Sequence, residues 1–141
     1  MIGVNNIFNI RYSKKNKWQG QTGSFRGFVN FDSRDHAIRA CFVILVNYIR
    51  SGYDTYRKII YRFAPPCEND SKGYLCFVCR SQLAGLPDLD PDSEVVQYDD
   101  LLQLMCRMAI VENSVFITKL DIIKAIKNSE NDTFLFSRIK M

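Results

Sequence analysis

The stretch "SRDHAIRACFVILVNYIRSG", residues 33–52, decides the fold, because the pattern of the chain changes there from short alternating segments to a helix. Ser33 is a suitable N-cap, Asp35 stands in the first turn, where the helix dipole favours a negative charge, and Gly52 ends the segment. Apolar residues go nearly all the way round this helix. The distribution predicts a central helix that is buried on most sides.

The residues before this helix predict a small β-lobe over about 5–32. The segments "IFNIRY" (7–12) and "GFVNF" (27–31) alternate between apolar and polar residues, as half-buried strands do. Between them, "SKKNK" (13–17) is polar and "WQGQTGSFRG" (18–27) is broken by glycines. We therefore expect short strands joined by turns, with the lysine-rich segment at the tip of a hairpin.

A helical part is predicted from residue 33 to about 128. After the central helix, a second helix follows Asp54, its expected N-cap, and stops at Pro65-Pro66. Further helices are predicted at about 73–84, closed by Gly85, at 98–113 and at 117–128, with a C-terminal tail at 129–141. The sequence therefore predicts a single α+β domain over 1–141, with a small N-terminal β-lobe followed by four or five helices.

Composition and charge narrow the class of protein. The 141 residues are 47% apolar and carry a formal net charge of +4, so the chain can bury one core. This weak charge does not make a basic stripe, and no nucleic-acid partner is expected. The longest apolar run, at 40–46, is too short for a transmembrane segment, and the first residues lack a signal-peptide pattern. We expect a protein made in the cytoplasm that reaches any outside target by another route.

Three other groups of reactive residues have ordinary structural explanations. Five cysteines, an odd number, fit reduced thiols. The C-x-x-C of Cys76 and Cys79 lies in a helical run as a core-facing pair, with zinc binding or redox chemistry as the alternative. The single histidine, His36, is structural or solvated, with a Cys–His catalytic pair as the alternative. The acidic segment 88–94 resembles a calcium loop only in part and is interpreted as a solvated loop. No metal or cofactor is predicted.

Two glutamates stand where acid–base chemistry is feasible. Glu112 ends an otherwise apolar helix, where the helix dipole disfavours a carboxylate and raises its pKa, as a general acid in glycoside cleavage requires. The alternative is an exposed glutamate at a frayed helix end. Glu68 follows Pro65-Pro66 at the start of a helix, and its alternative role is to cap that helix.

Several phrases follow one another in a characteristic order. They are "NNIFNIR", "W-x-G-Q", "FVNFDS", "AIRACFVIL", "YDTYRKIIYRFAPPCENDSKGYL" and "MAIVENS". Over about residues 5–116 they resemble a phage and prophage family of virion structural proteins, and "RFAPP-x-EN" is the most specific part. Two departures are visible: the family's usual Pro-Gly is Ile7-Phe8 here, and its usual glycine after "VEN" is Ser114.

A second resemblance concerns the chemistry. The order "NNIFNIR…KWQGQ…FVNFDS" is similar to the β-lobe of flagellar-type glucosaminidases of the lysozyme-like superfamily, and "ENDSKGY" (68–74) is similar in character to a later turn of those enzymes. Their catalytic glutamate belongs to a helix before the β-lobe. Here the helix ending in "CRMAIVENSVF" (106–116) follows the β-lobe, so the resemblance implies a circularly permuted lysozyme-like domain.

This resemblance implies a peptidoglycan-degrading glycosidase, of the muramidase or lytic transglycosylase type, from a phage or an interbacterial effector. Glu112 is the expected general acid and Glu68 the candidate second carboxylate. The expected partner is bacterial cell-wall glycan, bound by aromatic faces and hydrogen-bonding side chains, namely Trp18, Tyr74, Asn9, Arg11, Gln21, Asn69 and Asn113. The alternative for each is a role in the fold, such as bracing the hairpin or filling the core.

A non-catalytic protein is the alternative function. The same scaffold can serve as a virion structural protein or a glycan-binding protein, because a fold does not determine a function. Other virion or secretion-apparatus proteins are then further candidate partners. Under either interpretation the protein is expected to act in the virion or in the periplasm of a target cell.

Overall fold

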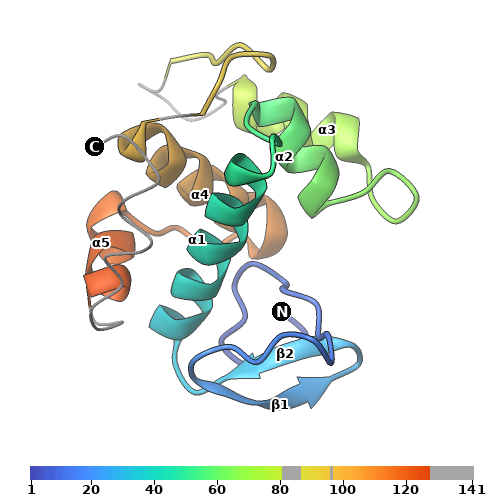
Figure 1. The fold of residues 1–141 in the computed structure, drawn as a ribbon, viewed down its shortest axis with the longest axis vertical. Helices are drawn as coiled ribbons and strands as arrows, with labels where there is room; N and C mark the ends of the chain where they lie inside the picture. The colour runs from blue at the N-terminus through green and yellow to red at the C-terminus, as the bar shows by residue number, and fades with distance from the viewer. Residues whose placement is uncertain (81–86, 96, 128–141) are drawn as a thin grey trace.

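The computed structural model describes residues 1–80, 87–95 and 97–127. In that part of the chain a two-stranded sheet is followed by five helices (Figure 1). The elements are β1 (Gln21–Phe25), β2 (Phe28–Phe31), α1 (Arg34–Arg50), α2 (Tyr56–Phe63), α3 (Ser71–Cys79), α4 (Tyr98–Asn113) and α5 (Lys119–Lys127). The predicted α+β class, with a small N-terminal β-lobe followed by four or five helices, is confirmed.

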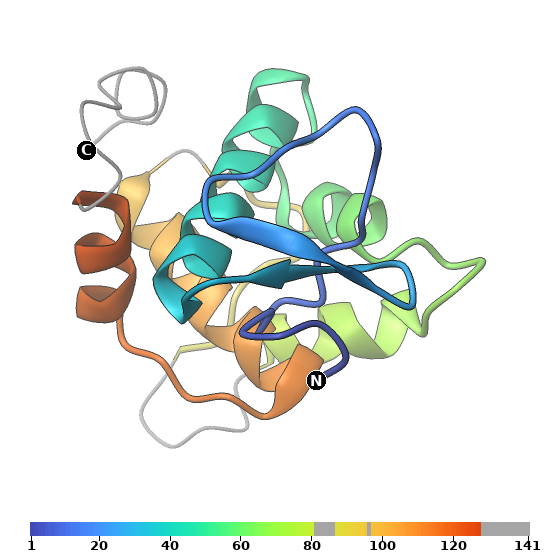
Figure 2. The same cartoon turned by 90° about the horizontal axis from the view of Figure 1, so that it is seen from below.

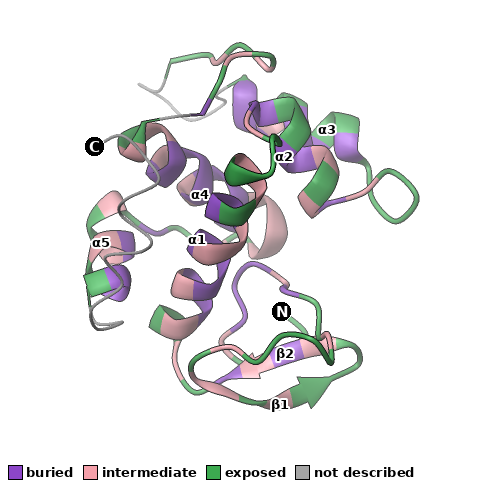
Figure 3. Ribbon diagram, in the orientation of Figure 1, coloured by how far each residue is buried: buried purple, intermediate pink, exposed green. Residues whose placement is uncertain are grey.

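Helix α1 is the centre of the molecule. Its N-cap is Ser33, whose hydroxyl accepts from the backbone N–H of His36 at 3.2 Å, and Gly52 follows its end with a φ of +93°. The helix packs against α2, α5 and β2. Figure 3 shows buried residues on α1, on α4 and on the inner strand β2, whereas β1 is largely exposed. The prediction of a central buried helix is confirmed.

The β-lobe forms its hairpin later in the sequence than expected. Strands β1 and β2 pair antiparallel, and the turn residues Arg26 and Gly27 have φ of +50° and +82°, which suits a tight hairpin turn. Residues 7–12, expected as a strand, have one isolated bridge, between Arg11 and Phe28. The lysine-rich segment 13–17 is therefore not the hairpin tip, and that prediction is wrong.

The side chain of Asn6 explains why the N-terminal segment is not a strand. This side chain is fully buried; its Oδ1 accepts from the N–H of Ile10 at 2.8 Å, and its Nδ2 donates to the carbonyls of Ile10 and Val29, each at 2.9 Å. These bonds hold a turn in which the neighbours Ile7 and Phe8 are both buried. A strand would place adjacent side chains on opposite faces.

Helix α2 begins one residue later than the predicted cap implies. Thr55 is its N-cap, and the Thr55 hydroxyl accepts from the N–H of Lys58 at 3.1 Å. Asp54, the expected cap, instead lies 3.8 Å from the ammonium group of Lys58 as an ion pair. Both side chains suit an N-cap, so only the backbone geometry distinguishes them.

Helix α3 has a different cap from the one considered. Asp70 is its N-cap and accepts from the N–H of Gly73 at 3.0 Å. Glu68 precedes this cap, so the alternative that Glu68 caps the helix is wrong. The predicted helix end at Gly85 and the predicted tail at 129–141 lie outside the described residues.

The described helices pack as a bundle beside the β-lobe. Helix α3 contacts α2 and α4, and α5 contacts α1 and α4. The hairpin lies at the N-terminal end of α1 (Figure 1), and the N-terminal loop lies against the end of α4 (Figure 2). Across residues 1–80, 87–95 and 97–127, no helix has both the length and the apolar character needed to cross a bilayer.

Replacing Asn6 with alanine should destabilise the protein, because the buried N–H of Ile10 and carbonyl of Val29 lose their partner. We expect the free energy of unfolding to fall by about 2–4 kcal/mol, measured by urea denaturation. Asn16→Ala is the matched control, since Asn16 is exposed, and it should change stability by less than about 0.5 kcal/mol. Equal losses in the two variants would contradict the role assigned to Asn6.

Candidate functional site

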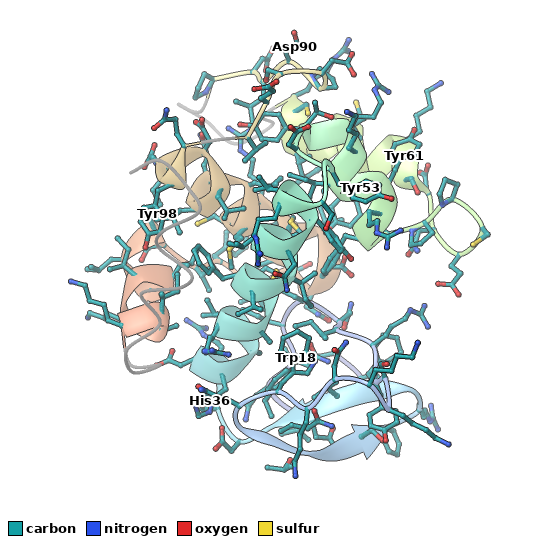
Figure 4. All side chains as sticks on the ribbon, viewed as in Figure 1. Trp18, His36, Tyr53, Tyr61, Asp90 and Tyr98 are labelled. Carbon is teal, nitrogen blue, oxygen red and sulfur yellow. The ribbon has the colours of Figure 1, made fainter. Side chains whose placement is uncertain are left out.

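A cleft of about 490 Å³ lies between the β-lobe and the helices. One wall comes from the N-terminal segment and the hairpin, and the other from α1, the end of α2 and the turn after it. Trp18 lies between the hairpin and α1 (Figure 4). The lining contains aromatic rings (Trp18, Phe28, Tyr48, Phe63) and polar side chains (Asn9, Arg11, Asn16, Asn47, Arg62, Glu68, Asn69, Glu112).

A second hollow, of about 560 Å³, adjoins the first at Glu112. Its lining comes from the start of α3 and the last turns of α4. Glu112 and Asn69 belong to the lining of both hollows. A ligand longer than one hollow could therefore extend to both sides of the Glu112 side chain.

The amide of Asn9 holds Glu112 in place. Glu112 is half-buried in the last turn of α4, and Asn9 Nδ2 donates to its Oε1 at 3.0 Å and to its backbone carbonyl at 3.2 Å. Asn9 Oδ1 in turn accepts from Nδ2 of Asn113 at 3.0 Å, and Asn113 also donates to the carbonyl of Ile7 at 2.9 Å. The structure thus places Asn9 and Asn113, expected to bind substrate, in the network that orients Glu112.

The carboxyl group of Glu112 is a weaker acid than an ordinary glutamate. Burial raises its pKa, whereas the hydrogen bond from Asn9, the Tyr74 hydroxyl and the charge of Arg11 act in the opposite direction. The C-terminal end of α4 also disfavours a negative charge at this position. A raised pKa lets a carboxyl keep its proton nearer to neutral pH, which is the requirement for a general acid.

Tyr74 lies beside Glu112 and is buried. Its side chain is 7% exposed, so the ring offers little surface to a sugar, contrary to the expected stacking role. Burial raises the pKa of the Tyr74 hydroxyl well above its usual range, and the charge of Glu112 adds to this. Within the described residues this hydroxyl has no hydrogen-bond partner of normal geometry. Tyr74 is therefore an uncharged side chain next to Glu112.

Arg11 and Glu68 form an ion pair across the cleft. Arg11 Nη2 lies 3.3 Å from Glu68 Oε2, with both side chains about half exposed, and the Arg11 guanidinium lies 5.1 Å from the ring centroid of Phe28. A tight turn presents Glu68 and Asn69, whose N–H groups both donate to the carbonyl of Pro65 at 3.0 Å. Both glutamates predicted for catalysis therefore line one cleft, but Glu68 already has a cationic partner.

Trp18 combines the two roles considered for it. Its ring is half-buried, packs against the core and also lines the cleft. Gln21 supports it, because Gln21 Oε1 accepts from the N–H of Trp18 at 3.0 Å and the N–H of Gln21 donates to the Trp18 carbonyl at 3.1 Å. Gln21 is not among the lining residues. The structure therefore places Gln21, expected to bind substrate, against the Trp18 backbone and outside the cleft lining.

The other reactive groups lie outside the cleft lining. His36 Nδ1 is 2.6 Å from Asp32 Oδ1, in a local contact at the start of α1. Cys79 is buried, and burial raises the pKa of its thiol to about 11, but Cys76 is exposed, so the expected core-facing pair is wrong for Cys76. In the described part of the chain, no group of three His, Cys, Asp or Glu residues is arranged to hold a metal ion.

Sequence reasoning missed the wall that α1 and α2 contribute. Asn47 and Tyr48 come from the last turn of α1, and Arg62 and Phe63 from the last turn of α2. The signal that points to part of this wall is the phrase "RFAPP-x-EN" at 62–69, most of whose residues line the cleft. Periodicity alone assigns such residues to helix faces and does not show which face borders a cleft.

The arrangement can donate a proton and bind a polar ligand. It provides a half-buried acid, a neutral tyrosine, an Arg–Glu ion pair, amide groups and aromatic rings. A comparison of the sequence with protein-family models gives no match, and a comparison with curated proteins gives none. The site is therefore interpreted from its geometry and chemistry.

The variant Glu112→Gln should be more stable than the wild type at neutral pH. Because the folded-state pKa of Glu112 is raised, its ionisation costs stability as the pH rises from the ordinary glutamate range through that pKa. Glutamine removes this cost and keeps an oxygen that accepts from Asn9. We expect a melting temperature higher by a few degrees at about pH 7, with no difference at about pH 3. Calorimetry, with the exposed Glu94→Gln as control, checks this; a less stable variant at neutral pH would contradict it.

The variant Asn9→Gly should raise the pKa of Glu112 further. Asn9 has a φ of +53°, which glycine adopts without strain, and the substitution removes the hydrogen bond that favours the carboxylate. Carbon-detected NMR titration of the glutamate side chains measures this pKa directly. Asn16→Gly removes another amide of the cleft and should leave the Glu112 titration unchanged. An unchanged or lower pKa in a folded Asn9→Gly variant would show that the bond does not control the acid.

Proposed function

We propose that the protein is a glycosidase that cleaves the glycan strands of peptidoglycan, as a muramidase or a lytic transglycosylase, with Glu112 as general acid. The observation that carries this proposal is a half-buried glutamate of raised pKa, fixed by Asn9 in the wall of a cleft. Aromatic rings and amides line the same cleft, and such groups bind sugar rings, hydroxyls and acetamides.

In the proposed reaction the protonated carboxyl of Glu112 donates its proton to the glycosidic oxygen. The bond between that oxygen and the anomeric carbon breaks, and positive charge develops on the sugar ring. The resulting carboxylate takes a proton from the attacking hydroxyl group. That hydroxyl belongs to water in hydrolysis, or to the same sugar in transglycosylation, which leaves an anhydro-sugar end.

Glu68 is the candidate for the second carboxylate. It lies 3.3 Å from the Arg11 guanidinium, and we assign it to electrostatic stabilisation of a positively charged sugar rather than to proton donation. An enzyme that uses water or the substrate's own acetamide does not need this group as a nucleophile. We therefore expect substitution of Glu112 to reduce the rate of cleavage more than substitution of Glu68.

The two hollows that meet at Glu112 support a polymeric substrate. A glycan strand lying in both would place one of its linkages next to the acid. The presence of Glu112 and Trp18 in one cleft is also what a circularly permuted lysozyme-like domain requires. An origin in a phage or an interbacterial effector, and delivery to the cell wall by a virion or secretion apparatus, rest on the sequence resemblance.

A non-catalytic glycan-binding or virion protein is the second candidate. The observation that favours it is the ion pair of Arg11 with Glu68, which leaves Glu112 as the one carboxylate of the described cleft lining without a cationic partner within 4 Å. A binding protein would use the same aromatic and amide groups and needs no acid. The two candidates differ in whether glycan is cut.

Purified cell wall distinguishes the candidates. We expect the wild type to lower the turbidity of a cell-wall suspension and to release soluble muropeptides, identified by mass spectrometry. Glu112→Gln should reduce the rate by roughly a hundredfold to ten-thousandfold, because a general acid contributes that much. Glu68→Gln should cause a smaller loss, and the exposed Glu94→Gln is the matched control.

Each alternative outcome has a separate meaning. Full activity of Glu112→Gln would exclude it as the acid. Sedimentation of the wild type with insoluble cell wall, without release of muropeptides, would favour the binding protein. If the wild type neither binds cell wall nor releases muropeptides, the glycosidase and the glycan-binding protein are both excluded. The ends of the products, reducing or anhydro, separate hydrolysis from transglycosylation.

A further inference from the structure

The cleft contains two arginines in different electrostatic settings. Arg11 is paired with Glu68 at 3.3 Å. Arg62 is held by aromatic rings: its guanidinium carbon lies 4.7 Å from the ring centroid of Tyr53 and 5.8 Å from that of Tyr48. The two rings pack edge to face, with centroids 6.4 Å apart. Figure 4 shows Tyr53 beside α2, the helix that carries Arg62.

Arg62 has no anionic partner in the part of the chain that the structure describes. Among residues 1–80, 87–95 and 97–127, no carboxylate lies within 4.0 Å of its guanidinium, although the group lines the cleft. The two carboxylates of the lining are otherwise engaged, Glu68 by Arg11 and Glu112 by Asn9. The helical wall of the cleft therefore presents a fixed cation with open hydrogen-bonding capacity.

Among the described residues, the contacts of the Arg62 guanidinium are with the Tyr48 and Tyr53 rings, and no hydrogen bond or ion pair engages its N–H groups. A cation–π contact uses the face of a guanidinium, whereas carboxylate recognition uses its N–H groups in two parallel hydrogen bonds. The tyrosine rings also limit the rotamers of Arg62, which lowers the entropy lost when a ligand binds. Arg62 both contacts the two tyrosine rings and lines the cleft, so a ligand in the cleft can reach its guanidinium.

We infer that Arg62 binds a carboxylate carried by the ligand, so that the cleft selects acidic glycans over neutral ones. The chemical class is a glycan strand whose sugars carry carboxylate groups, on an ether or a peptide substituent, as opposed to a neutral polymer of N-acetylated hexosamine. This inference rests on the proposed function for the glycan. It assigns Arg62 as a specificity-determining residue that binds a substituent of the sugar, whereas Glu112 would protonate the glycosidic oxygen.

Binding measurements in a non-cleaving background test this inference. Trp18 is the single tryptophan of the chain and lines the cleft, so its fluorescence reports occupancy. Glu112→Gln and the double variant Glu112→Gln/Arg62→Gln are titrated with soluble peptidoglycan oligomers that have free carboxylates. The same oligomers after carbodiimide amidation, and neutral chitohexaose, are the comparison ligands. We expect Arg62→Gln to weaken binding of the free-carboxylate oligomers about tenfold and to leave the two neutral ligands unchanged.

The matched control is Arg26→Gln in the same background. Arg26 also lies over an aromatic ring, 5.2 Å from the centroid of Phe25, but it does not line the cleft. The double variant Glu112→Gln/Arg26→Gln should bind all three ligands as tightly as Glu112→Gln does. Equal weakening by Arg26→Gln would mean that net charge alone governs binding and would overturn the inference.

The failure of this inference can be told apart from failure of the proposed function. Suppose that wild-type lysis depends on Glu112, but that Arg62→Gln weakens binding of the free and the amidated oligomers equally, or weakens binding of neither. The carboxylate site is then overturned, and the glycosidase proposal stands. If Glu112→Gln binds none of the glycans and the wild type releases no muropeptides, both are overturned. Circular dichroism of each variant confirms that it is folded.

Discussion

The contact between Asn9 and the last turn of α4 is the interaction on which the rest of the structure depends. A two-stranded hairpin is marginally stable by itself, so the β-lobe needs a docking partner. Asn9 bonds both the backbone and the side chain of Glu112, and Asn113 bonds back to the loop. Asn9 and Ser114 both have positive φ, of +53° and +54°, a conformation that costs free energy in residues other than glycine. Such strain is often concentrated at functional sites.

Asn9 and burial have opposite effects on the pKa of Glu112. A hydrogen bond that holds a carboxylate also favours its ionised form, which would weaken a proton donor. Burial acts against that effect and prevails, so the pKa of Glu112 is raised while Asn9 still fixes its geometry. Tyr74, kept neutral by its own burial, adds no charge to the site. The cleft thus contains an acid that is both well oriented and protonated more readily than usual.

Features set by neighbouring residues could be predicted from the sequence, and those set by distant residues could not. The cap, the end and the burial of α1 are local properties, and all were predictable. The choice of Thr55 over Asp54 as a cap depends on backbone geometry that the residue types do not reveal. The direction of the pKa shift of Glu112 could be predicted from its place at a helix end, but the main cause, burial, depends on residues elsewhere in the chain. Its partner Asn9 is 103 positions away, and no local pattern connects the two.

This separation has a consequence for how the site comes into being. A contact that spans 103 positions carries a higher loop-closure cost than a local one, so we expect it to form after the local turns and helices. In a growing or partly folded chain, the segment around Asn9 can already exist while Glu112 is still a solvated carboxyl of ordinary acidity. The chemical character of this glutamate therefore depends on a fold that joins residues 9 and 112, and a piece of the polypeptide that lacks either side of this contact does not possess it.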